Sequence, residues 1–109
     1  ISCQEEDIEY KLIELYYLYG KKLEQHSKDL ALTQYRKALM LNPGYKEKDF
    51  FEALILFKSG RIKKSISILK KYLDENPDGL WHDKGLKLMD EIKNSPFPGV
   101  ISWIKGLLD

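Results

Sequence analysis

The chain has 109 residues, with 18 Lys and Arg against 17 Asp and Glu, a single cysteine and a net charge of +1. This length suits one domain, and one cysteine excludes an internal disulfide or a zinc site built from cysteines. The interspersed, nearly balanced charges argue against nucleic acid as a partner, and no apolar run approaches the roughly 20 residues that cross a bilayer.

The first residues, Ile1-Ser2-Cys3, resemble the end of a bacterial lipoprotein signal peptide and the cysteine that follows its cleavage site. The resemblance implies lipidation of Cys3, a tail or tether over residues 1–9, and a location at the bacterial cell envelope. The acidic and polar residues 4–7 suit such a tether. A plain thiol in a cytoplasmic protein is the alternative interpretation.

Two helices are predicted between residues 8 and 43. Six large apolar residues recur at the spacing of one helical face: Ile8, Leu12, Leu15, Tyr16, Tyr19 and Leu23. Ser27 is a suitable N-cap for the second helix, which ends before Pro43 because a residue that precedes proline avoids the α region.

A second pair of helices follows the same plan. Residues 46–58 form the first, and Ser59-Gly60 ends it with a left-handed glycine. The second runs from Ile62 to Asn76-Pro77. Because residues 50–57 are apolar on nearly all sides, we expect that helix to lie between neighbouring helices.

The two pairs are related by an internal repeat of 34 residues. Asn42-Pro43 recurs as Asn76-Pro77, and over twelve steps before them small residues match small and apolar match apolar. Such a period is typical of stacked helical hairpins.

These residues resemble the tetratricopeptide repeat (TPR) family, whose unit is a 34-residue helix–turn–helix. The inter-helix spacing in the first unit is one residue short, and Glu52 stands where the family has leucine. The first unit supplies Tyr16, Tyr19, Gly20, Leu23, Ala31, Tyr35, Ala38 and Pro43, and the second Ala53, Leu56, Gly60, Ser65, Leu69, Tyr72 and Pro77.

The resemblance implies an all-α, TPR-like solenoid of about two and a half repeats over residues 10–95, divided at 10–43, 44–77 and 78–95. Residues 96–109 are expected to form a C-terminal capping helix, because apolar residues recur there at helical spacing. The alternative is that this helix docks on a partner or a membrane surface.

In TPR arrays the first helix of each unit lines a concave face that binds peptides. The same register places Glu14, Glu24, Glu47 and Glu91 on this face. Its implied groove residues are Tyr17, Lys21, Phe50, Leu54, Phe57, Lys58, Trp81, Lys84 and Leu88. Aromatic anchors with a charged rim are typical of binding hot spots. The competing interpretation is that the C-terminal helix fills the groove with Trp103 and Ile104.

We therefore expect a non-catalytic module that binds a protein or peptide partner, without a cofactor, metal or small-molecule substrate. His26 and His82 lie in different units, and the chain contains none of the residue groupings that catalysis requires. The alternative function is self-assembly through the ends of the array or the C-terminal helix.

Overall fold

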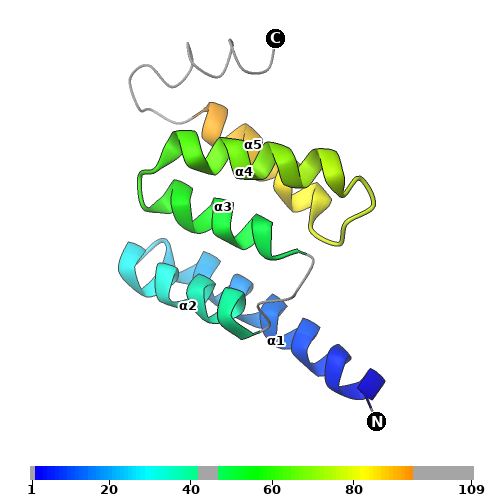
Figure 1. The fold of residues 1–109 in the computed structure, drawn as a ribbon. Coiled ribbons are helices and arrows are strands. Elements are labelled where there is room, and N and C mark those ends of the chain that lie inside the picture. Colours follow the sequence, from blue (N-terminus) through cyan, green and yellow to red (C-terminus); the bar gives the residue numbers. More distant parts are fainter. Residues whose placement is uncertain (1, 42–46, 95–109) are drawn as a thin grey trace.

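The computed structural model describes residues 2–41 and 47–94, with side chains from residue 8 onward. All secondary structure in this part of the chain is helical (Figure 1), which confirms the predicted all-α class. The helices are α1 (Ser2–Leu23), α2 (Lys28–Leu41), α3 (Lys48–Lys58), α4 (Ile62–Glu75) and α5 (His82–Lys93).

The helices pack in chain order, each against the next, and α3 also contacts α5. Figure 1 shows α1 and α2 at one end of the stack, α4 and α5 at the other, and α3 between them. The position of α3 explains why it is apolar on nearly all sides. Its side chains with at most 1% exposure are Phe50, Phe51, Ala53 and Leu54. The predicted position between neighbouring helices is therefore confirmed.

Local sequence accounts for the turns. The Ser27 hydroxyl accepts a hydrogen bond from the Leu30 backbone N–H at 3.3 Å, as expected of an N-cap. Gly60 has φ of 88°, which L-residues with a side chain rarely adopt. The chain can therefore reverse over three residues, 59–61, and α4 packs back against α3.

Residues 34 positions apart occupy equivalent buried sites on α2 and α4. One of these sites is Ser65 on α4. Its hydroxyl donates a hydrogen bond to the Ala53 carbonyl at 2.6 Å, which satisfies this polar group inside the core. The equivalent pairs are Ala31 with Ser65, Tyr35 with Leu69, and Ala38 with Tyr72, each residue at most 2% exposed.

α1 buries a different face from the one that the apolar spacing indicated. Ile13 and Gly20 are buried against the other helices, and Tyr16 and Leu23 are only half-buried. Four of the six residues of the predicted stripe remain exposed: Ile8, Leu12, Leu15 and Tyr19. This outer face of α1 has no partner among the described residues.

The ends of the chain bear on two further predictions. α1 begins at Ser2, so most of the segment expected to be a tail or tether is helical. α5 lies within residues 78–95, the range of the third predicted unit. The predicted capping helix over residues 96–109 lies outside the described residues.

Candidate partner-binding groove

The residues predicted to line a groove come together where α1, α3 and α5 meet. Six of the nine line one surface hollow of about 150 Å³. Lys87 and Glu91 complete the lining of this hollow. The six are Tyr17, Lys21, Phe50, Leu54, Lys84 and Leu88.

Aromatic side chains form the floor of this hollow. Tyr17 lies 5.8 Å from Phe50 and 5.0 Å from Trp81, measured between ring centroids, and Phe50 stacks on Trp81 at 5.3 Å. Phe50 is only 1% exposed and Trp81 3%. These two rings are therefore core residues whose edges meet the groove, and Tyr17 is the accessible ring.

A second hollow of about 130 Å³ continues along α1 and the start of α5. Lys84 lines both hollows, so they are neighbours, and we call the two together the trough. The lining residues of the second hollow are Tyr10, Lys11, Glu14, Leu80, Trp81 and Lys84. The lining residues of the two hollows come from α1, from α3, from α5 and from the turn that precedes α5.

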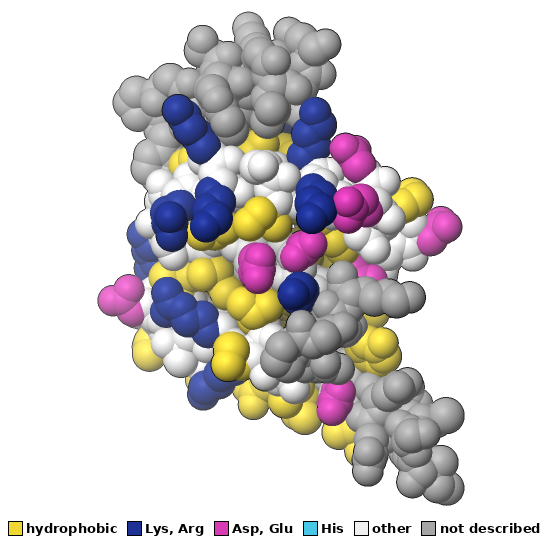
Figure 2. Space-filling model, viewed as in Figure 1, with side chains coloured by type: hydrophobic (Ala, Val, Ile, Leu, Met, Phe, Trp, Pro, Cys, Tyr) yellow, Lys and Arg dark blue, Asp and Glu magenta, His cyan; other side chains and the backbone are white. Residues whose placement is uncertain are grey.

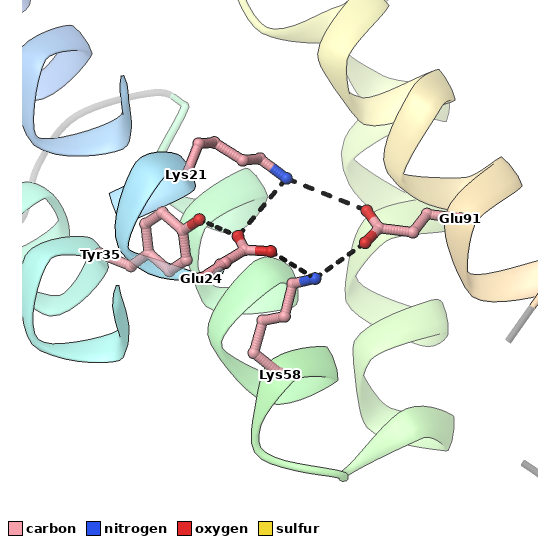
Figure 3. Close-up of polar contacts among 5 residues, drawn as sticks. All are labelled: Lys21, Glu24, Tyr35, Lys58 and Glu91. Atoms are coloured by element: carbon pink, nitrogen blue, oxygen red, sulfur yellow. Dashed lines mark hydrogen bonds and ion pairs between the residues drawn. The ribbon is translucent and has the colours of Figure 1, made fainter. Parts of the chain in front are cut away.

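An ion cluster borders the first hollow, which Lys21 and Glu91 help to line, and it connects α1, α3 and α5 (Figure 3). Lys58 on α3 lies 2.8 Å from both Glu24, in the turn just after α1, and Glu91 on α5, measured from Nζ to Oε1. Lys21 lies 3.6 Å from Glu24 Oε2 and 3.9 Å from Glu91 Oε2. The Tyr35 hydroxyl on α2 donates a hydrogen bond to the same Glu24 carboxylate. The cluster therefore fixes the relative positions of the helices that line the trough.

The cluster alters the protonation equilibria of its members. Burial alone would raise the pKa of the Glu24 carboxyl, but hydrogen bonds from Lys58 and Tyr35 and the charge of Lys21 outweigh burial and lower that pKa. For Lys58, burial would lower the pKa, and the bonds to Glu24 and Glu91 raise it instead. Both side chains are therefore held in their charged forms.

Tyr17 is protonated throughout the physiological range. Burial, followed by the charges of Glu24 and Glu91, raises the pKa of its hydroxyl to about 12. Tyr17 therefore presents to the trough an uncharged hydroxyl that can donate a hydrogen bond.

Two lysines of the trough have no carboxylate partner among the described residues. The Lys84 ammonium lies 5.0 Å from the Trp81 ring centroid and 6.0 Å from that of Tyr17. Lys87 lies one helical turn further along α5 and lines the same hollow. Unlike Lys21 and Lys58, neither of these ammonium groups forms a salt bridge with a described carboxylate.

Sequence reasoning missed several features of the site. It placed Glu24 and Glu91 on the concave face but did not predict their pairing with Lys58, because these residues lie far apart in the chain. Phe57 and Lys58 lie at the ion cluster, with the Lys58 ammonium 5.1 Å from the Phe57 ring centroid. The lining residues that the prediction omitted are Tyr10, Lys11, Leu80 and Lys87.

Two other kinds of site are not found in the part of the chain that the structure describes. The described residues contain no group of three His, Cys, Asp or Glu side chains placed to hold a metal ion. None of the described helices has the length and apolar character to cross a membrane. The Cys3 side chain lies outside the described side chains, so its lipidation stays a prediction.

Comparison of the chain with protein-family models, curated proteins and solved structures gave no match.

Proposed function

We propose that this chain is a TPR-like array whose concave trough binds a peptide segment of a partner protein, without catalysis. The observation that carries the proposal is the trough itself, which α1, α3 and α5 line jointly. The helical hairpins and the equivalent burial of residues 34 apart support the TPR-like arrangement.

The dimensions of the trough favour a peptide over a small molecule. Its two hollows measure about 150 and 130 Å³, whereas pockets for drug-sized ligands usually enclose about 300–1,000 Å³. Each hollow suits one side chain, and the shared Lys84 between them suits a peptide that runs along the trough. An extended peptide can place successive side chains in such a row of shallow sites.

The chemistry of the trough favours a peptide that combines aromatic or aliphatic side chains with carboxylates. The Tyr17 ring and Leu88 offer apolar contact, and Lys84 and Lys87 offer positive charge without a carboxylate partner among the described residues. A ligand carboxylate at this place would gain charge-assisted hydrogen bonds.

A displayed library of random peptides tests the proposal. Peptides enriched on the wild-type protein should bind it in solution, and the double variant Lys84→Glu/Lys87→Glu should weaken that binding at least about tenfold, since both charges reverse. The matched control is Lys64→Glu/Lys71→Glu, two exposed lysines of α4 outside the trough. Equal binding to the wild type and to the trough variant would contradict the proposal.

A further inference from the structure

The outer face of α1 carries an exposed apolar stripe that neither the core nor the trough uses. The residues at positions 8, 12, 15 and 19 are spaced by four, three and four, so they lie within roughly 60° of arc on one side of the helix. Their exposed fractions are 57% for Ile8, 37% for Leu12, 59% for Leu15 and 54% for Tyr19. Figure 2 shows hydrophobic side chains along the lower edge of the molecule, at the α1–α2 end of the stack.

The spacing of the stripe is that of a coiled-coil seam. Apolar residues that alternate at intervals of three and four occupy the a and d positions of a heptad, which face a partner helix. Continued in both directions, the same spacing reaches Glu5 and Lys22, which are the next seam positions of α1. The stripe is thus bounded by an acid at its N-terminal end and a base at its C-terminal end.

We propose that this stripe pairs with the α1 stripe of a second copy of the chain, in antiparallel orientation about a two-fold axis between Leu12 and Leu15. In that register Ile8 faces the partner's Tyr19 and Leu12 faces the partner's Leu15. An isologous interface requires such self-complementarity.

Charge specifies the orientation. Antiparallel pairing places the acidic position 5 of one copy opposite the basic position 22 of the other at both ends of the stripe. Parallel pairing would place Glu5 opposite the partner's Glu5 and Lys22 opposite the partner's Lys22, and like charges in register oppose association.

The area of the stripe suits a concentration-dependent dimer. With about 200 Å² of surface for each large apolar side chain, the exposed fractions leave roughly 400 Å² on each copy. Two facing stripes then bury about 800 Å² in total, which lies below the range for stable specific interfaces and matches a weak, concentration-dependent dimer. The dimer leaves the trough open, because Tyr17 and Lys21 lie on a different side of α1.

Sedimentation equilibrium between about 5 and 500 μM tests the pairing. The average mass should rise from 12.8 kDa towards twice that value. Leu15→Glu should keep the protein monomeric with unchanged helical circular dichroism, because the side chain is 59% exposed. Leu86→Glu, a control at a 48% exposed leucine of α5, should associate as the wild type does.

Disulfide cross-linking in a Cys3→Ser background tests the orientation. A mixture of Ile8→Cys and Tyr19→Cys chains should form mainly the mixed dimer. The two Ile8→Cys sites of an antiparallel pair would lie at least about 16 Å apart along the helix, beyond the reach of a disulfide.

Two outcomes would overturn the proposal. One is a mass of 12.8 kDa at every concentration. The stripe would then bind another protein or residues 96–109 of the same chain instead of a second copy. The other is preferential cross-linking of Ile8→Cys chains to one another, which would indicate parallel pairing. If Leu15→Glu lowers the helical content, Tyr19→Glu provides the same test at the edge of the stripe.

Discussion

At Gly20 of α1, an added Cβ would lie 2.4 Å from Cε1 of Tyr35 on α2. The Tyr35 ring cannot move aside easily, because it is fully buried and its hydroxyl is bonded to Glu24. Glycine is therefore required here for close packing of two helices, although it weakens the helix itself.

We predict that Gly20→Ala destabilises the protein by about 1–2 kcal/mol, measured by urea denaturation. Overpacking in a tight core costs about 1–3 kcal/mol, and the better helix propensity of alanine recovers up to about 1 kcal/mol. In a Tyr35→Leu background the same substitution should be neutral or stabilising. An equal cost in both backgrounds would show that the Tyr35 ring is not the cause.

At the scale of the elements, Glu47 connects three of them. It immediately precedes α3, and its carboxylate accepts hydrogen bonds from the Tyr72 hydroxyl on α4 and from the backbone N–H of Leu80, just before α5. Its side chain is buried at 7% exposure. A buried carboxylate with these partners specifies how α4 and the turn that precedes α5 lie against the start of α3.

Replacing this carboxylate should cost more than removing one of its partners. We expect Glu47→Ala to lower the free energy of unfolding by about 2–3 kcal/mol and Tyr72→Phe by about 1.5–2 kcal/mol, because each loses a hydrogen bond to a charged group. The double variant should be more stable than the sum of the two losses implies. Strict additivity in urea denaturation would mean that the two side chains act independently.

The helices could be predicted from the sequence because their signals are local. Apolar spacing, Ser27, Gly60 and the Asn-Pro pairs predicted four helices, although α1 begins at Ser2 and includes most of the segment expected to be a tail, and the Asn42-Pro43 turn lies outside the described residues. The buried face of α1 could not be predicted, because an apolar stripe shows that a face avoids water but not which neighbour covers it. Ile13 and Gly20 are selected by their contacts with other helices, which no local pattern contains.

At the scale of the whole molecule, the ion cluster links the two ends of the stack through Glu24, Lys58 and Glu91. The folded-state pKa of Glu24 lies below its ordinary value of 4.5. The carboxylate therefore stabilises the fold fully above about pH 4.5, and this contribution is lost as the pH falls through the lowered folded-state pKa.

We predict that Glu24→Gln lowers the free energy of unfolding by about 1–2 kcal/mol at pH 7, a value reduced for partial solvent exposure. The difference from the wild type should shrink progressively when urea denaturation is repeated towards pH 3, because both proteins then lack the charge. Lys64→Gln, at an exposed lysine of α4, serves as a control without this pH dependence. A constant difference at all pH values would exclude the charge of Glu24 as the cause.

The location of the candidate site could be predicted, but its accessibility could not. The repeat register brings Tyr17, Lys84 and Leu88 to one face, and the structure places all three in one hollow. Burial of Phe50 and Trp81 depends on how closely α1, α3 and α5 approach one another, and the sequence period does not determine that distance. The ligand contacts available to a partner therefore come from Tyr10, Tyr17 and the lysines rather than from all the aromatic residues.

The central claim is that the trough formed by α1, α3 and α5 binds a peptide, and amide chemical-shift perturbation tests it most directly. A library-enriched peptide titrated into the ¹⁵N-labelled protein should shift most strongly the signals of Tyr17, Lys84, Lys87 and Leu88 and the Trp81 indole. Signals from the exposed face of α4 should stay unchanged. Dominant shifts on α4 or on the outer face of α1, with the trough signals unmoved, would contradict the proposed function.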